Sequence, residues 1–271
     1  MRNISPPIFN ARNTYISFIK GKRKTTQALL KGLQAAVLTS YAAYNANSLA
    51  TLIPLTLTAE QEEALLTCYR SNAKPQKSLW NDTIDRAGAL CPYCGSREIA
   101  EVDHFAPQSL FPEFSTFPLN LIGICGHCNK IKDNQLSSGG GSRIFFHAYL
   151  DQIPADSYCL TASTIWNNNV LSFNFELDEN CPNIPQALMN ILKSHIKKLN
   201  ILKDFAIKAQ EDFYKKGEWE NLIETPERLR EKIQNYITVR RQKEGPFSWE
   251  AAYLLAVLND NQAITYLCEP R

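Results

Sequence analysis

The sequence predicts a mostly helical protein that carries a small α+β core between two helical lobes. Apolar residues recur at intervals of three and four over residues 25–47 and again over 188–213, which is the spacing of amphipathic helices. Between them, residues 99–104 and 119–124 are short apolar segments with the length and composition of strands. We therefore expect three parts, which are an N-terminal helical lobe at 1–88, a core at 89–150, and short strands followed by a helical lobe at 151–271.

The N-terminal lobe contains three predicted helices. The first covers residues 25–47. Thr58 and Gln61 have the spacing of a capping box, so a second helix begins there and runs to about Tyr69. A third helix spans residues 76–87.

The chain beyond the core begins with a glycine- and serine-rich segment at 138–142, which predicts a flexible hinge. The stripe at 188–213 resembles a heptad pattern, but over so short a length it packs within its own chain more often than it forms a coiled coil. The other predicted elements are strands at 158–161 and 170–175 that can pair as a hairpin, a helix at 226–242 and a last amphipathic helix at 247–258.

Composition excludes several classes of protein. The 271 residues are 44% hydrophobic and 21% charged, which is ordinary for a globular chain and unlike collagen or a disordered tail. The sequence has no apolar segment of about 18 residues, the length that a membrane-spanning helix needs. The first residues lack the apolar core of a secretion signal. We therefore expect a cytoplasmic protein with no membrane partner.

The net charge of +2 conceals an uneven distribution. Residues 1–88 carry 11 Lys and Arg against 5 Asp and Glu, and residues 185–243 carry 13 against 8, whereas residues 89–150 carry 4 against 5. The basic flanks fit a surface that follows phosphates, and they fit ordinary solvated helix faces equally well. The cluster at 20–24 has the same two interpretations.

The spacing of the eight cysteines is the most specific feature. Cys91 and Cys94 form one Cys-x-x-Cys pair, and Cys125 and Cys128 form a second about thirty residues later. Two such turns suit a tetrahedral zinc site with four thiolates, although two unrelated turns with buried thiols or a labile disulfide would share the spacing. His127 could replace a ligand, but four thiolates already complete the tetrahedron. We expect the other cysteines to be small buried thiols, namely Cys68, Cys159, Cys181 and Cys268.

A closed zinc site of this kind is structural, so chemistry must come from the residues between the pairs. Asp103 and His104 end the first predicted strand, and Pro107 follows it. Asn120 begins the second strand, and Asn129 lies in a short helix that directly follows it. The local order is therefore strand, loop, strand and helix, with zinc joining the hairpin to the start of the helix.

These residues together resemble the HNH endonuclease family, a ββα-metal fold with a Cys₄ zinc clamp. The resemblance covers residues 89–135, and all of the motif elements occur in order. The last HNH position is Asn129 rather than histidine, as in phage junction-resolving endonucleases and related nucleases. The resemblance implies that His104 is the general base, that Asp103 and Asn129 hold one Mg²⁺ or Mn²⁺, and that Asn120 orients His104.

Three further residues keep two interpretations each. Lys132 could contact phosphate, but an exposed lysine on a short helix is the commoner case. His147 could reach the cleft from a segment that is more often packed aromatic core. His195 lies on the apolar stripe and fits a core histidine better than a metal ligand.

The first functional hypothesis is a metal-dependent endonuclease that nicks or cuts DNA, with RNA not excluded as a substrate. The alternative is a zinc-stabilised adaptor that binds nucleic acid or protein without hydrolysis, which would have no need for Asp103, His104 and Asn129 together. The layout also resembles HNH effector subunits that accompany ATPases in bacterial anti-phage systems. That resemblance implies a role in anti-phage defence and regulation by an ATPase partner.

Overall fold

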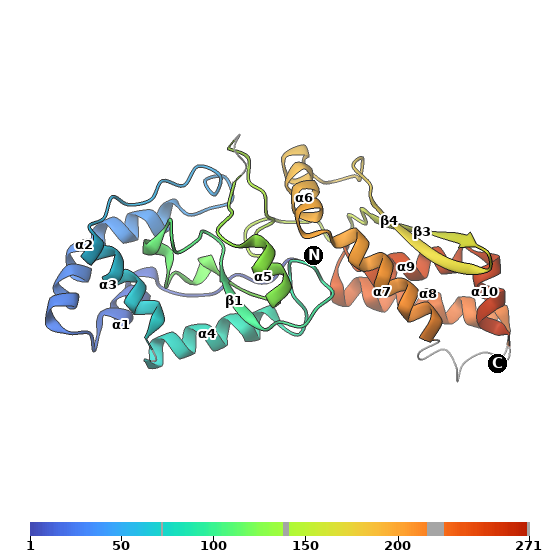
Figure 1. Cartoon of the computed structure of the whole chain (residues 1–271), viewed down its shortest axis with the longest axis horizontal. Helices are drawn as coiled ribbons and strands as arrows, with labels where there is room; N and C mark the ends of the chain where they lie inside the picture. The colour runs from blue at the N-terminus through green and yellow to red at the C-terminus, as the bar shows by residue number, and fades with distance from the viewer. Residues whose placement is uncertain (72, 138–140, 216–224, 270–271) are drawn as a thin grey trace. The chain divides into compact units, whose positions relative to one another are not determined.

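The computed structural model describes residues 1–71, 73–137, 141–215 and 225–269 (Figure 1). It confirms a mostly helical chain with two small two-stranded sheets. The chain forms two compact units. We call them the N-terminal unit, residues 3–93 and 97–152, and the C-terminal unit, residues 153–271 with 1–2 and 94–96. The three-part division expected from the sequence stays a prediction.

The N-terminal unit contains the predicted strand-loop-strand-helix core. Its elements are α1 (Ala11–Ile19), α2 (Lys24–Ala43), α3 (Ala59–Arg70), α4 (Lys74–Ala87), β1 (Glu101–His104), the 3₁₀ turns η1 (Pro112–Phe114) and η2 (Pro118–Asn120), β2 (Leu121–Ile124) and α5 (Gly126–Lys132). The capping box is confirmed, since Thr58 accepts from the backbone of Gln61 and Gln61 accepts from the backbone of Thr58. Helix α1 was not predicted; its sequence signal is Asn10, which caps it by accepting from the amide of Asn13.

An aromatic cluster fills the space between α2 and the loop that follows β1. Tyr41 stacks on Phe117 with ring centroids 4.0 Å apart, and Tyr44 meets Phe114 and Phe117 edge-on. Aromatic rings bury large areas with defined geometry. The cluster therefore fixes the loop between the two strands against α2.

The C-terminal unit is a hairpin packed against helices (Figure 1). Asn168 and Asn169 form the hairpin turn, and both have positive φ. A two-residue turn needs this conformation when its twist matches that of the strands. Strand β4 packs on α7, and β3 packs on α9. The elements of this unit are β3 (Leu160–Asn167), β4 (Val170–Leu177), α6 (Gln186–Leu199), α7 (Ile201–Lys215), α8 (Pro226–Glu244), α9 (Trp249–Leu258) and α10 (Asn261–Cys268).

Three expectations for the C-terminal unit were wrong in detail. The stripe at 188–213 is two helices, because Asn200 adopts the left-handed conformation (φ 54°) that ends α6. The first strand of the hairpin begins at Leu160 rather than 158 and runs longer than predicted. The helix at 247–258 is not the last, since α10 follows it with Asp260 as its N-cap.

The expectation of buried thiols was wrong for two of the four isolated cysteines. Cys159 and Cys181 form a disulfide across 22 residues, joining the segment before β3 to the segment after β4. Cys68 is a buried thiol as expected, whereas Cys268 is half-buried. No spacing pattern in the sequence distinguishes the bonded pair.

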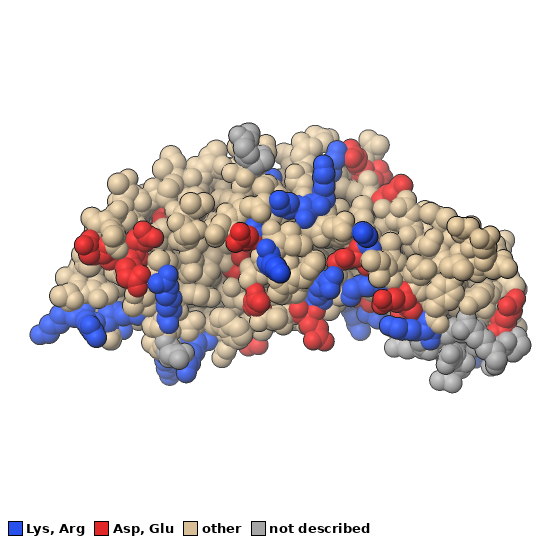
Figure 2. Space-filling view, viewed as in Figure 1, with Lys and Arg blue, Asp and Glu red and all other residues tan. Residues whose placement is uncertain are grey.

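The surface of the N-terminal unit carries a basic edge. Figure 2 shows lysine and arginine side chains gathered where α1 meets α2 and where α4 begins, at the lower left of the view. The exposed residues in these segments include Lys20, Arg23, Lys24, Lys74 and Lys77.

None of the helices in the described part of the chain has the length and apolar character needed to span a bilayer. The hinge predicted at 138–142 falls largely on residues 138–140, which lie outside the described residues.

Candidate active site

Four cysteine side chains converge at the predicted metal position. The sulfur atoms of Cys91, Cys94, Cys125 and Cys128 all lie within 4.8 Å of one another, and all four residues are buried. Zinc–sulfur bonds of about 2.3 Å in a tetrahedron separate sulfurs by about 3.8 Å, so the cluster fits one zinc ion. The amide of Cys128 also donates to the sulfur of Cys125 at 3.4 Å. The cluster supports a structural zinc at the start of α5.

The hairpin of β1 and β2 brings Asp103 and His104 to one cleft. Asp103 lies opposite Ile122 and His104 opposite Leu121 in the antiparallel register. Adjacent strand residues ordinarily point to opposite faces, but His104 is the last residue of β1, so the regular alternation ends there. Both side chains line a cleft of about 540 Å³, and Asn129 from α5 lines it too.

Asp103 forms a buried ion pair with Lys132. The Lys132 Nζ lies 3.0 Å from Asp103 Oδ1 and 2.9 Å from the carbonyl oxygen of His104, and the side chain of Lys132 is fully buried. The expectation of an exposed lysine was therefore wrong, because a buried carboxylate lies within its reach. Burial raises the pKa of Asp103 and Lys132 opposes the rise. Asp103 Oδ2 is buried and has no partner at normal hydrogen-bond geometry among the described residues, while the Tyr93 hydroxyl interacts with the same carboxylate and also opposes the rise in its pKa.

His104 is held as a neutral imidazole. Its Nε2 lies 2.9 Å from the carbonyl oxygen of Ser115, which can only accept, so Nε2 carries the proton and Nδ1 keeps its lone pair. The Gln108 carboxamide is 2.9 Å from the same nitrogen, and a proton there requires that Gln108 turn its oxygen to the ring. Burial lowers the pKa of His104 to about 4, and Lys132 adds to the lowering. At neutral pH this histidine can accept a proton.

Asn120 lies behind the cleft and connects the two ends of the loop that follows His104. Its Oδ1 accepts from the amide of Ala106 at 2.7 Å, and its Nδ2 donates to the carbonyl oxygens of Ala106 and Phe114. Its backbone oxygen accepts from the amide of Phe105, the residue after His104. The side chain is fully buried. Asn120 does not line the cleft, so its contacts suit a positioning role.

Asn129 has a partner that the sequence reasoning missed. Its Nδ2 donates to a carboxylate oxygen of Glu101, which lines the same cleft. The other Glu101 oxygen lies where a Cβ on Gly126 would come within 2.9 Å, so a glycine there makes room for the carboxylate. The missed signal is strand periodicity, since Glu101 is two residues before Asp103 and shares its face. The bond leaves the Asn129 oxygen available as a ligand.

The remaining histidines do not line the cleft. His127 is exposed on α5. His147 is fully buried against Phe105 and Tyr149, as a packed aromatic segment predicts. His195 is buried within the C-terminal unit, as expected for a core histidine.

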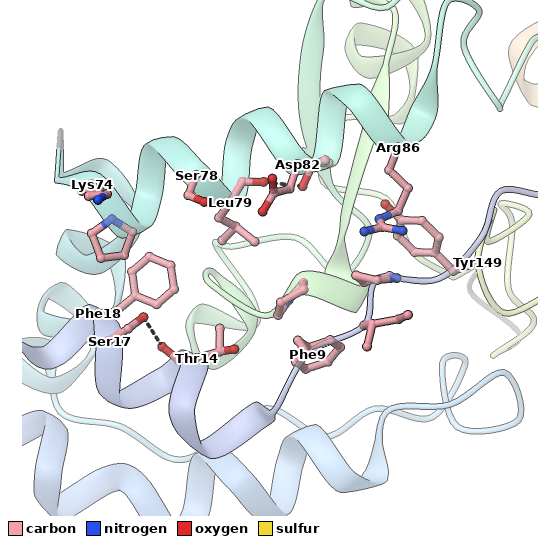
Figure 3. Close-up of a pocket in the computed structure, with 15 residues that line it drawn as sticks. Phe9, Thr14, Ser17, Phe18, Lys74, Ser78, Leu79, Asp82, Arg86 and Tyr149 are labelled. Atoms are coloured by element: carbon pink, nitrogen blue, oxygen red, sulfur yellow. Dashed lines mark hydrogen bonds between the residues drawn. The ribbon is translucent and has the colours of Figure 1, made fainter.

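A second pocket of the N-terminal unit, about 400 Å³ in volume, lies between α1 and α4. Figure 3 shows Phe9 and Phe18 on its α1 side, with Asp82 and Arg86 along α4. The charged residues that line it, Lys74, Asp82 and Arg86, are all at least partly exposed. The cleft at β1 instead holds an ionisable pair and a neutral histidine, so it is the candidate active site.

Comparison with known proteins agrees with this position. Residues 91–135 match the HNH endonuclease family, which confirms the resemblance seen in the sequence. A stretch of 144 residues is 28% identical to protein ea31 of Escherichia phage lambda, and it covers 52% of this chain and 47% of the phage protein. This chain therefore spans about half the length of that relative. No solved structure matches. The comparisons therefore show that residues 91–135 are similar to a family of endonucleases.

Proposed function

We propose that this protein is a divalent-metal-dependent endonuclease that hydrolyses phosphodiester bonds in DNA. His104 acts as the general base, and Asp103 and Asn129 hold one Mg²⁺ or Mn²⁺. The observation that carries the proposal is the pairing, in one cleft, of a neutral histidine with a carboxylate and a carboxamide of complementary roles. Ionisable groups with perturbed pKa values that gather in one cleft make that cleft a candidate functional site.

The residues of the cleft suit the metal that the family uses. Hard cations such as Mg²⁺ take oxygen ligands and keep several waters, and Asp103 and Asn129 offer a carboxylate and an amide oxygen. Asp103 Oδ2, the oxygen that does not bond Lys132, is a carboxylate oxygen of this kind. When bound, the ion neutralises phosphate charge and stabilises the leaving oxygen. Glu101 adds a second carboxylate beside Asn129.

His104 supplies the proton acceptor. Nδ1 takes the proton of an attacking water while the water oxygen forms its bond to phosphorus, and the bond from phosphorus to the leaving oxygen breaks. The leaving oxygen then takes a proton from solvent. Lys132 and the carbonyl of Ser115 hold the backbone and ring of His104 in place during this step. Because the pKa of His104 is lowered to about 4, the base is unprotonated at neutral pH.

The basic edge of the N-terminal unit supports a polyanionic substrate. The exposed lysines and arginines near the start of α2 and α4 can neutralise backbone phosphates without reading bases. We therefore expect little intrinsic sequence preference and binding that weakens steeply with salt.

Anti-phage defence and control by an ATPase partner are part of the same proposal, supported by the layout of an HNH segment with helical flanks. The helical lobes on both sides of the HNH segment would then be a docking surface. Co-purification from the native host checks this, and recovery of the chain alone under gentle conditions would remove the partner from the proposal.

The test of the activity is cleavage of supercoiled plasmid by purified protein, with Mg²⁺, Mn²⁺ or EDTA, beside a single-stranded RNA of similar length. We expect nicked or linear plasmid with metal and intact plasmid with EDTA. Cleavage of the RNA alone would correct the substrate. Tight DNA binding with no cleavage in either metal would favour the adaptor instead.

A further inference from the structure

Asn120 has two supporting residues that lie outside the HNH segment at 91–135. The Tyr44 hydroxyl, at the C-terminal end of α2, is 2.9 Å from Asn120 Oδ1. The same hydroxyl is 3.2 Å from Nε2 of His147. All three side chains are buried, with relative exposures of 4% for Tyr44 and 0% for Asn120 and His147. A chain of polar groups therefore crosses the core of the N-terminal unit.

The direction of each hydrogen bond in this row of groups can be assigned from the neighbours that only donate or only accept. The backbone amide of Tyr149 donates to Nδ1 of His147, so Nδ1 carries no proton and Nε2 does. His147 Nε2 then donates to the oxygen of Tyr44. The Tyr44 hydroxyl is left to donate to Asn120 Oδ1, which can only accept. With these directions Tyr44 accepts one hydrogen bond and donates one, and the carbonyl oxygen of Leu119 is a further acceptor for the His147 ring.

The electrostatic environment keeps this arrangement in one protonation state. Burial raises the pKa of Tyr44 well above its ordinary value, and Asp103 adds to the rise. Burial lowers the pKa of His147 well below its ordinary value, and Arg143 adds to the lowering. Both groups stay neutral across the range in which a nuclease works, so the hydrogen bonds keep their direction.

This row of hydrogen-bonded groups ends at the groups that hold His104. Asn120 bonds the backbone of Ala106 on one side of the loop and that of Phe114 on the other. Phe114 is followed by Ser115, whose carbonyl accepts from His104 Nε2. A turned Asn120 carboxamide would exchange donor for acceptor at both ends of the loop. The Tyr44 hydroxyl opposes that turn because it offers a proton to Oδ1 alone.

We propose that Tyr44 and His147 are positioning residues for the nuclease reaction, acting through Asn120 to fix the orientation of His104. The proposal rests on the nuclease function proposed above. It extends the functional site to residues 76 positions before and 27 positions after Asn120 in the chain. The HNH segment then depends on the rest of its unit for catalysis as well as for folding.

The test compares two tyrosines that each lose only a hydroxyl. Tyr44→Phe keeps the ring contacts and removes the bond to Asn120. Tyr15→Phe is the matched control, because Tyr15 is also buried in this unit and its hydroxyl donates to the carbonyl of Leu30 at 2.9 Å. We expect Tyr44→Phe to lower kcat for plasmid nicking roughly 10- to 100-fold with KM changed less than about twofold, as misplacement of a catalytic group does. Tyr15→Phe should keep the wild-type kcat.

A second variant and a spectrum separate positioning from general packing. His147→Gln should lower kcat as Tyr44→Phe does, and the double variant should lose no more than the larger single loss because the residues act as one chain. The ¹⁵N signals of His147, recorded on protein that keeps its zinc but has no added Mg²⁺ or Mn²⁺, should report a protonated Nε2 in the wild type and shift in Tyr44→Phe.

Three outcomes would overturn the proposal. They are wild-type kcat in Tyr44→Phe, an equal loss in Tyr15→Phe, or a protonated Nδ1 on His147. An inactive wild type would refute the nuclease function and this role with it. An active wild type with an unaffected Tyr44→Phe would refute the role alone.

Discussion

The two compact units of this chain bury different kinds of side chain. The N-terminal unit buries five charged residues, which are Asp103, Glu113, Lys132, Arg143 and Asp151. In the described part of the C-terminal unit, the buried polar side chains are His195 and three serines. None of these four is an aspartate, glutamate, lysine or arginine. Its core consists of apolar and aromatic residues from the β3–β4 hairpin, α7 and α9.

The difference indicates which unit carries the free-energy cost of burying charged side chains near the candidate site. Removing a charge from water is unfavourable unless the charge is paired and hydrogen-bonded. The N-terminal unit meets that requirement with two ion pairs, Lys132–Asp103 and Arg143–Asp151. Asp103 lines the candidate site, and Asp151 accepts a hydrogen bond from the backbone amide of His147. We therefore expect the N-terminal unit to respond sharply to loss of one partner, and the C-terminal unit to respond as an ordinary apolar core.

Removal of zinc should produce the largest difference in stability between the two units. Structural zinc contributes on the order of 10 kcal/mol to folding in small zinc domains. Three of the four ligands, Cys91, Cys125 and Cys128, belong to the N-terminal unit, so chelation or Cys125→Ser should unfold that unit. The C-terminal unit should keep its helices and protection. Elemental analysis should give about one zinc per chain, and hydrogen exchange should locate the loss. Cys68→Ala, a buried thiol outside the cluster, is the control. Zinc-free protein with native protection throughout would contradict the comparison.

Lys132→Met should lower the free energy of unfolding of the N-terminal unit by about 3–5 kcal/mol, because it leaves the buried Asp103 carboxylate uncompensated. The control is Lys130→Met on the same helix, where the lysine is exposed and a change within about 0.5 kcal/mol is expected. Urea denaturation without added metal measures both. Equal values for the two variants would show that the buried pair does not stabilise the unit.

Loss of the Cys159–Cys181 disulfide should lower the stability of the C-terminal unit by about 2–4 kcal/mol, as closure of a loop of this length predicts. The variant is Cys159→Ala with Cys181→Ala, and denaturation with and without a reducing agent measures the effect. Plasmid nicking should be unchanged. A reductant that destabilises the double variant as much as the wild type would exclude this bond as the cause.

Acid should weaken the N-terminal unit through His147. Its folded pKa lies well below the unfolded value of about 6.5, so below that pH the unfolded chain takes up a proton that the folded chain excludes. The contribution of neutral His147 to the free energy of unfolding is fully present above about pH 6.5. It should fall by about 2 kcal/mol by about pH 5. Denaturation of the wild type and of His147→Gln between these pH values gives the difference. Identical slopes would mean that His147 is protonated in the folded state.

Sequence patterns point to the candidate site because its motif is local. The zinc ligands and the residues Asp103, His104, Asn120 and Asn129 lie within forty positions of one another, so fixed spacings carry the chemistry. The structure brings Asp103, His104 and Asn129 to one cleft and sets Asn120 behind them. Their catalytic roles stay predictions until activity is measured.

The interactions that sequence reasoning missed are non-local. Lys132 is buried because it reaches Asp103 across 29 positions, and no feature of its own helix indicates this. Tyr44 meets His147 across 103 positions, and Cys159 meets Cys181 without a recognisable motif. Asn200 divides one apolar stripe into two helices, because the periodicity continues through a residue whose backbone is left-handed. Tertiary packing decides the first three, whereas the break at Asn200 is a local backbone conformation; hydrophobic periodicity reports neither.

The most direct measurement of the central claim is the rate of plasmid nicking by His104→Ala with Mg²⁺ or Mn²⁺, beside His127→Ala as the control for an exposed histidine of the same segment. Removal of a general base should lower the rate by about 10²–10⁴-fold. Zinc content, DNA affinity and unfolding temperature should stay close to those of the wild type, and His127→Ala should nick normally. Wild-type nicking by a folded, zinc-loaded His104→Ala protein would contradict the account.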